Sequence, residues 1–180
     1  MSHADTIFAL ASAPGRAGVA VLRVSGPHCL DSLTALSPAP IEPRVASLRH
    51  LKAPVSRETI DKALVLYFAC PASYTGEDLV EYHLHGGRAV VDSMMRYLRD
   101  CDGHRMAEPG EFTRRSFENG KIDLTEAEAV ADLIDAETQA QKTQALAQVD
   151  GALSNLYEGW TDRLKRTLAH IEADIEFPDE

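Results

Sequence analysis

Ionisable and apolar residues alternate in the segment between residues 78 and 85. The ionisable residues at alternate positions are Glu81, His83 and His85. Because the side chains of a β-strand point alternately to its two faces, a strand here would bring all three to one face. Such a row lines a wet groove or a binding site, or it faces bulk solvent, and the spacing alone does not decide between these.

Three features near this row allow further chemistry. The two histidines have a spacing that a metal site accepts, but no third ligand is evident nearby in the sequence. Gly86 and Gly87 follow at an expected strand-to-helix junction, where free backbone N–H groups can hold an anion. A tight turn at that junction would require the same two glycines.

A cation is expected within a second strand. Arg23 shares a strand face with Val19 and Val21 in the apolar run 19–24. An arginine in this position needs a carboxylate or a bound anion as its partner. An internal aspartate or glutamate is the simpler partner, and a bound anion is the alternative.

Lys121 follows Gly120 at an expected helix end, where it could be either a phosphate contact or a partner of the helix dipole. The phosphate-loop pattern Gly-x-x-x-x-Gly-Lys-Ser/Thr fails, because residue 115 is arginine and residue 122 is isoleucine. We therefore expect that this chain alone does not hydrolyse nucleoside triphosphates. The nucleophile pattern Gly-x-Ser-x-Gly is also missing from the sequence.

Composition indicates a folded intracellular protein. The 180 residues are 44% hydrophobic and 26% charged, which fits one domain or one domain with a fragment. No apolar run approaches the ~18 residues of a membrane span, and the N-terminus lacks a signal-peptide pattern. We expect a cytoplasmic location without membrane contact. The three cysteines show no Cys-x-x-Cys spacing, so neither a disulfide framework nor a zinc ribbon is expected.

The net charge of −10 is unevenly distributed. Residues 1–118 hold 13 basic and 14 acidic residues, whereas residues 119–180 hold 5 basic and 14 acidic residues. Neither part carries the basic surface that binding to a phosphate backbone requires. If a nucleic acid is a partner, another domain or polypeptide must supply most of the positive field.

Two regions differ in their secondary-structure pattern. Eight of the nine prolines precede residue 110, which predicts short elements there and long helices afterwards. Apolar runs predict strands at 6–11, 19–24, 63–68 and 78–85, with a weak edge strand inside 38–54. Short helices are expected after Pro27, Gly87 and Gly110. Strands interleaved with helices predict an α+β or α/β class.

The second region predicts a helical hairpin. A capping box at Thr125 and Glu128 would start a helix that continues to Val149, and Gly151 would end it. Apolar residues at spacings of three and four predict a second helix over 153–175, which Pro178 would stop. Two such helices bury little surface, so we expect their apolar faces to need further helices.

Seven segments together resemble a known family. They are D-T-I at 5–7, A-P-G-R-A-G-V-A-V-L-R-V-S-G at 13–26, Y-T-G-E-D at 74–78, H-G-G at 85–87, P-G-E-F-T at 109–113, N-G-K-I-D-L-T-E-A-E-A at 119–129 and F-P-D-E at 177–180. In this order they resemble the N-terminal part of the tRNA-modification GTPase MnmE (TrmE) family. The resemblance covers essentially the whole chain.

The resemblance implies an α+β domain over 1–118, with a mixed β-sheet similar to that of folate-binding aminomethyltransferases. This domain would form a homodimer and bind a tetrahydrofolate derivative, either 5-formyl- or 5,10-methylene-tetrahydrofolate. Residues 119–180 would be the first half of a helical domain with two long helices. The family's inserted GTPase domain and its C-terminal Cys-x-Gly-Lys motif are absent, so we expect the chain to be a fragment.

For the whole enzyme, the resemblance implies action on tRNA together with the flavoprotein partner MnmG (GidA). The two proteins would modify C5 of the wobble uridine with a one-carbon unit from the folate. GTP hydrolysis, with Mg²⁺ and K⁺, would belong to the domain that this chain lacks. The alternatives are a dimerisation scaffold without folate binding and a free-standing one-carbon transferase.

The family's folate-contacting positions fall on Arg23, Glu81 and Lys121. A pterin presents an N–H and an amino group side by side, and the Glu81 carboxylate could accept both. Arg23 or Lys121 could neutralise the carboxylates of the folate tail. Arg16, in the glycine-rich loop, and His85 are further candidates for contact with the ligand.

Overall fold

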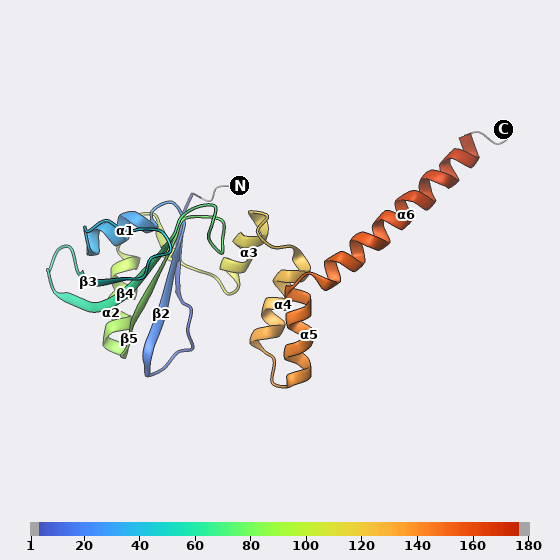
Figure 1. Cartoon of the computed structure of the whole chain (residues 1–180). Coiled ribbons are helices and arrows are strands. Elements are labelled where there is room, and N and C mark those ends of the chain that lie inside the picture. Colours follow the sequence, from blue (N-terminus) through green and yellow to red (C-terminus); the bar gives the residue numbers. More distant parts are fainter. Residues whose placement is uncertain (1–3, 177–180) are drawn as a thin grey trace. The chain divides into compact units, whose positions relative to one another are not determined.

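The computed structural model describes residues 4–176, which belong to two compact units (Figure 1). The first unit ends at Lys121 and the second begins at Ile122, three residues later than the sequence predicts. The difference arises because residues just after helix α3 (Glu111–Glu118) are bonded back to the first unit. Asn119 donates a hydrogen bond from Nδ2 to the Thr75 carbonyl, and Lys121 donates from Nζ to the Pro71 carbonyl.

A mixed β-sheet forms the frame of the first unit, and this confirms the α+β class. The strands are β1 (Thr6–Leu10), β2 (Ala17–Ser25), β3 (Ser47–Lys52), β4 (Thr59–Phe68), β5 (Leu79–Gly86) and β6 (His104–Met106). Their order is β3-β4-β5-β2-β1-β6, and only the β1–β6 pair is parallel. The edge strand β3 lies inside the expected segment, whereas the three-residue β6 has too short a pattern to be predicted.

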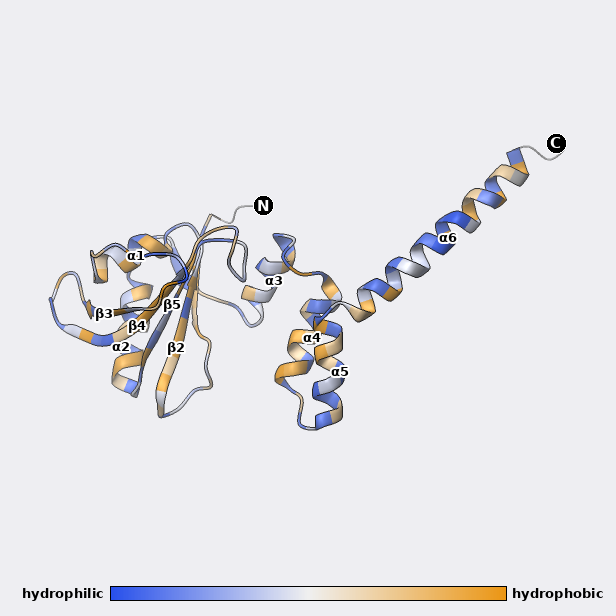
Figure 2. Ribbon diagram, viewed as in Figure 1, coloured by the Kyte–Doolittle hydropathy of each residue, from blue (hydrophilic) through white to orange (hydrophobic). Residues whose placement is uncertain are grey.

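Helices cover one face of this sheet. The helices of the first unit are α1 (Cys29–Leu36), α2 (Arg88–Arg99) and α3 (Glu111–Glu118). Alternate residues of β2 and β5 pack with α1 and α2 into the hydrophobic core, and the apolar colouring of the central strands is visible in Figure 2. These core residues include Leu22, Val24, Val80, Tyr82, Leu84, Leu33 and Met94. The intervening side chains of β2 and β5 therefore face away from both helices.

A buried guanidinium joins three distant segments of the first unit. Arg115 of α3 is fully buried. It donates from Nη2 to Asp5 Oδ1 at 2.8 Å and to Glu111 Oε1 at 3.3 Å, and from Nη1 to Glu77 Oε2 at 3.2 Å. Hydrogen bonds from Arg105, above all, lower the pKa of Glu111 to about 2, although burial opposes this shift. The ion pairs of Arg115 thus join α3 to the N-terminal segment and to the loop before β5.

The second unit contains three helices, not the two expected. They are α4 (Leu124–Ile134), α5 (Gln139–Val149) and α6 (Ala152–Glu176). The expected helix from Thr125 to Val149 is interrupted because Thr138 adopts an extended conformation and caps α5 in a capping box with Gln141. The interruption lets α5 pack against α4.

The first cap of this unit also differs from the prediction. Asp123, rather than Thr125, is the N-cap of α4, and its carboxylate accepts the Glu126 backbone N–H at 2.8 Å. Glu126 in turn accepts from the Asp123 backbone N–H, so the box lies two residues earlier than Thr125 and Glu128. Aspartate is at least as good a cap as threonine and adds a favourable interaction with the helix dipole.

Helix α6 carries the apolar stripe that the spacing predicts. Its exposed apolar residues are Leu156, Tyr157, Trp160, Leu164, Leu168, Ile171 and Ile175. Pro178, expected to stop this helix, and the F-P-D-E segment lie outside the described residues. Across residues 4–176, no helix combines the length and apolar character that a membrane crossing would need.

We predict that Arg115→Met lowers the free energy of unfolding by about 3 to 5 kcal/mol, because it removes the buried hydrogen bonds to three carboxylates and leaves Glu77 without its cation. Urea denaturation measures this loss. Arg114→Met is the matched control, since the neighbouring Arg114 is half exposed and its ion pairs should contribute no more than about 1 kcal/mol. Equal losses in both variants would contradict the role given to Arg115.

Candidate functional site

Two predicted site residues form one ion pair on the sheet face opposite α1 and α2. Arg23 of β2 and Glu81 of β5 are directly opposite each other in the antiparallel register. Arg23 donates to Glu81 Oε1 from Nε at 2.9 Å and from Nη2 at 2.7 Å. Both side chains are partly buried, with 26% and 15% of their surface exposed. The sequence predicts that Arg23 needs a carboxylate or an anion as its partner. In the structure this partner is the Glu81 carboxylate.

Two aromatic rings lie against the guanidinium of this pair. Its Cζ atom is 5.3 Å from the ring centroid of Tyr74 and 5.6 Å from that of Phe112. The Tyr74 hydroxyl is hydrogen-bonded to Thr113 of α3 at 2.9 Å, which ties the two ring-bearing segments together. The sequence alone gives these rings no evident role, although both lie in the motifs that carry the family resemblance.

His83 continues the row on β5 next to Glu81. Its Nε2 lies 3.6 Å from Glu81 Oε2, the carboxylate oxygen that Arg23 does not use. This Nε2 is buried and has no hydrogen-bond partner among the described residues. The alternation along β5 agrees with the prediction, since Tyr82 and Leu84 are buried on the core side.

Lys121, the third predicted site residue, is not part of this ion pair. Its ammonium donates to the Pro71 carbonyl at 3.0 Å, at the start of the loop that also carries Tyr74. Its side-chain stem lies against Gly76, whose φ of +77° favours glycine. A Cβ at position 76 would lie 3.1 Å from Lys121 Cγ, so the glycine makes room for the lysine.

The two looser candidates have different environments. Arg16 is exposed in the loop before β2. His85 is bonded through Nδ1 to Asp61 Oδ1 at 2.8 Å, and its backbone N–H donates to Asp61 Oδ2 at 2.8 Å. The pairing between β4 and β5 ends at Leu64 and His83. Beyond this pair, the Asp61 carboxylate provides the hydrogen-bond acceptor for the β5 backbone N–H of His85. Sequence reasoning missed Asp61, because nothing local links it to a residue 24 positions later.

Possible metal ligands are dispersed in the described residues, and two of the three cysteines are at least partly buried. No cluster of three or more His, Cys, Asp or Glu side chains in residues 4–176 could hold a metal ion. Cys29 is buried and Cys101 half-buried, and burial raises the pKa of both thiols, which makes them poor nucleophiles. Cys70 is exposed.

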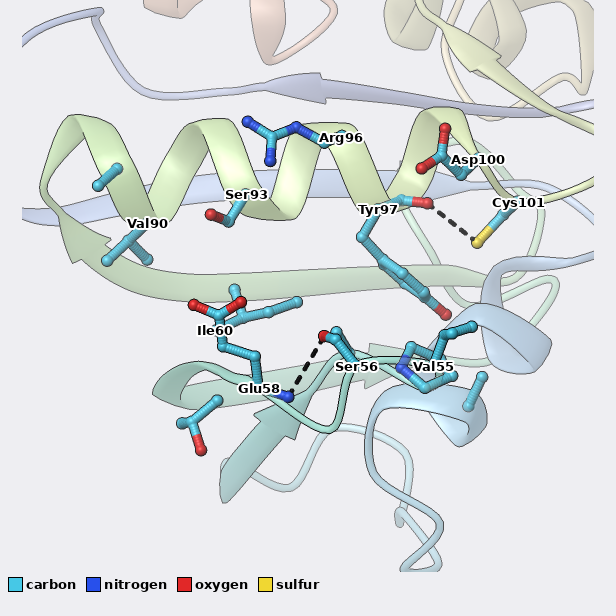
Figure 3. A pocket seen from close by; sticks show the side chains of 15 residues that line it. Val55, Ser56, Glu58, Ile60, Val90, Ser93, Arg96, Tyr97, Asp100 and Cys101 are labelled. Atoms are coloured by element: carbon cyan, nitrogen blue, oxygen red, sulfur yellow. Dashed lines mark hydrogen bonds between the residues drawn. The ribbon is translucent and has the colours of Figure 1, made fainter.

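A cavity of about 700 Å³ lies on the helix side of the sheet, between α2 and the segment 53–60 (Figure 3). Val90 and Tyr97 of α2 and Ile60 of β4 contribute apolar surface, and Glu58 and Arg96 contribute charges. None of the three predicted site residues lines this cavity. The cavity and the Arg23–Glu81 ion pair therefore lie on opposite sides of the sheet.

Two family profiles match the sequence. The family described as GTP-binding protein TrmE N-terminus matches residues 6–121, and the MnmE helical domain matches residues 124–180.

Curated relatives match nearly the whole chain. The tRNA modification GTPase MnmE of Parvibaculum lavamentivorans is 56% identical over 98% of this chain and 40% of its own length. The MnmE of Caulobacter vibrioides is 58% identical over 98% of this chain and 39% of its own length. The mitochondrial 5-taurinomethyluridine tRNA synthase subunit GTPB3 of Homo sapiens is 54% identical over 97% of this chain and 36% of its own length. The chain thus spans at most 40% of the length of these relatives.

Gly86 and Gly87, which follow His85, differ in how closely other atoms approach them, so the substitution of one serves as the control for the other. A Cβ on Gly86 would lie 2.4 Å from the Ala17 carbonyl oxygen, whereas a Cβ on Gly87 would meet no described atom within 4 Å. We expect Gly86→Ala to cost about 1 to 3 kcal/mol of stability, because the backbones of β2 and β5 must move apart. Gly87→Ala should change stability by less than about 0.5 kcal/mol. Thermal unfolding compares the two, and a larger effect at Gly87 would refute this packing argument.

Proposed function

The chain belongs to the MnmE (TrmE) family, and we propose that its first unit binds a tetrahydrofolate derivative used in the modification of tRNA. The observation that carries the proposal is the Glu81 carboxylate on the free face of the sheet. One of its oxygens is held by Arg23, and the other faces the unpartnered Nε2 of His83. The protein thus presents hydrogen-bond acceptors that no described residue uses.

The residues present fit a reduced pterin. A pterin offers an N–H and an amino group side by side, and a carboxylate accepts such a donor fork. Glu81 is the acceptor in this proposal, and Arg23 orients it through two hydrogen bonds to one oxygen. Tyr74 and Phe112 pack against the Arg23 guanidinium and so help to hold the cation that orients the carboxylate. The bound folate would supply the one-carbon unit of the reaction.

Two cations are available for the acidic tail of a folate. Lys121 is bonded to the loop that carries Tyr74, and its ammonium is exposed, so it can exchange a neutral carbonyl partner for a carboxylate. The hydrogen bonds of Arg23 to Glu81 use Nε and Nη2, so Nη1 takes no part in them. In this proposal the tail carboxylates are neutralised by Lys121, with Arg23 as the second cation.

The activity of the whole enzyme needs parts that this chain does not span. The names of the relatives describe a GTPase that modifies tRNA, and this chain contains no P-loop pattern. In our proposal GTP, Mg²⁺ and K⁺ bind elsewhere in the full-length relatives. With a charge of −10, this chain would leave tRNA contacts to a more basic partner, such as the flavoprotein MnmG. Their joint product would be a uridine modified at C5 of the wobble position.

Exposed apolar residues support a homodimer of the first unit. Leu48 of β3 and Leu64 of β4 are cross-strand partners on the free face of the sheet, and Val19 of β2 is also exposed there. An apolar patch on a sheet face commonly marks an interface. In the second unit, the exposed stripe of α6 would be covered by further helices of the helical domain.

We predict that Glu81→Gln weakens binding of 5-formyltetrahydrofolate by ~1–3 kcal/mol, roughly tenfold to hundredfold, because an amide N–H would then face a ligand N–H. Isothermal titration calorimetry measures the affinity. Glu58→Gln is the control, because Glu58 lines the cavity on the other side of the sheet. If only Glu58→Gln weakens binding, the folate occupies that cavity. The absence of saturable binding to the parent chain would favour a dimerisation scaffold.

We also predict that Leu48→Lys weakens self-association at least about tenfold. The dimer would then have to bury the new lysine charges or bring the two of them close together. Light scattering at tens of micromolar measures the fraction of dimer. Val55→Lys is the control, since Val55 is 97% exposed and lies at the turn between β3 and β4. A parent chain that is monomeric at these concentrations would contradict the proposed homodimer.

A further inference from the structure

We propose that His83 is a pH-sensitive positioning residue for the ligand that Glu81 binds. In its neutral form the ring offers Nε2 as a second acceptor for the ligand's N–H groups. In its protonated form the ring donates to Glu81 and competes with the ligand. The inference rests on the proposed folate site and adds to it a residue and a pH dependence.

The first support is the position of the ring. His83 lies two residues from Glu81 on the same face of β5, and its Nε2 is 3.6 Å from Glu81 Oε2. Arg23 directs both of its hydrogen bonds to Oε1, so Oε2 is the oxygen left for other donors. A ligand group that donates to Oε2 would therefore lie beside the imidazole.

The second support is an unsatisfied buried atom. Nε2 of His83 is shielded from solvent and has no hydrogen-bond partner among the described residues. Buried polar atoms in folded proteins are nearly always paired, and an exception calls for a water, an ion or a ligand. A neutral ring with its proton on Nδ1 sets two acceptors, Nε2 and Oε2, side by side. A group with two adjacent N–H donors, such as the amidine edge of a reduced pterin, would satisfy both.

The other elements around the ring present cations but no carboxylate that is free to pair with it. The cross-strand neighbours of His83 are Val21 on β2 and Leu64 on β4, and neither ionises. On the same face the flanking ionisable residues of those strands are Arg23, which is bonded to Glu81, and Lys62. On β5 itself, His85 is paired with Asp61. Glu81 is thus the carboxylate that a protonated His83 would meet.

Protonation and ligand binding therefore oppose each other. Histidine changes its charge between about pH 5 and 8, and a protonated ring would donate from Nε2 to Glu81 Oε2. Because the proton binds the free site and not the occupied one, ligand affinity must fall as the pH falls. If one proton competes with the ligand, the affinity falls by at most about tenfold for each pH unit, and it reaches this limit once the ring is mostly protonated.

The test compares the affinity for 5-formyltetrahydrofolate at pH 7.5 and pH 5.5 by calorimetry. We expect the parent chain to bind more weakly at pH 5.5 than at pH 7.5, with about a hundredfold loss as the upper limit for one competing proton over two pH units. His83→Gln places an amide that can accept but cannot be protonated, so it should bind within about threefold of the parent at pH 7.5 and lose the pH dependence. His50→Gln, at an exposed histidine on β3, should behave like the parent.

A third variant tests the role as acceptor. His83→Leu should bind about tenfold more weakly at pH 7.5 and show no pH dependence, because the ligand loses one acceptor. Far-ultraviolet circular dichroism confirms that each variant is folded. If His83→Leu does not fold, the pH profile of His83→Gln still decides.

The results separate this inference from the proposed function. A parent chain and His83→Gln that lose affinity equally with falling pH would overturn the inference, and so would an unchanged affinity of His83→Leu. In either case a loss of binding in Glu81→Gln would leave the folate site intact. If the parent chain does not bind the folate at all, the proposed function falls and the role of His83 falls with it.

Discussion

The buried guanidinium of Arg115 is the interaction on which the arrangement of the first unit depends. It holds carboxylates from the N-terminal segment, from the loop before β5 and from α3 itself. That loop carries Tyr74 and α3 carries Phe112, so the same charge cluster places both rings against Arg23. Since an unpaired buried charge is very costly, the three segments cannot separate without a large loss of stability.

The sheet divides the first unit into two chemical environments. Side chains of β2 and β5 on one face form the core with α1 and α2, and those on the other face include Arg23, Glu81 and His83. A strand can serve both purposes because its side chains alternate. The polar site therefore lies on the rigid backbone of the core, which limits how far its groups can move when a ligand binds.

Family membership and local geometry support the same function through different arguments. The relatives are named as GTPases that modify tRNA, and the proposed folate site is supported by two acceptor atoms, Glu81 Oε2 and His83 Nε2, that no described residue bonds. In the proposed site, the carboxylate held by Arg23 would accept from the N–H groups of a pterin and would repel a nucleotide phosphate. The acidic character of the chain is compatible with the proposed function, in which this chain would bind the folate and other parts would contact the tRNA.

The sequence by itself determined what depends on neighbours along the chain. Alternation placed Glu81 and His83 on one strand face, and the spacing of three and four in α6 predicted its apolar stripe. The break before Thr138 was also local, but its capping box was overlooked. Only the tertiary structure decided that Glu81 is the partner of Arg23, 58 residues away, and that Lys121 is bonded to another segment. Such pairs depend on strand register and on the packing of buried charges, which join segments that no local pattern connects.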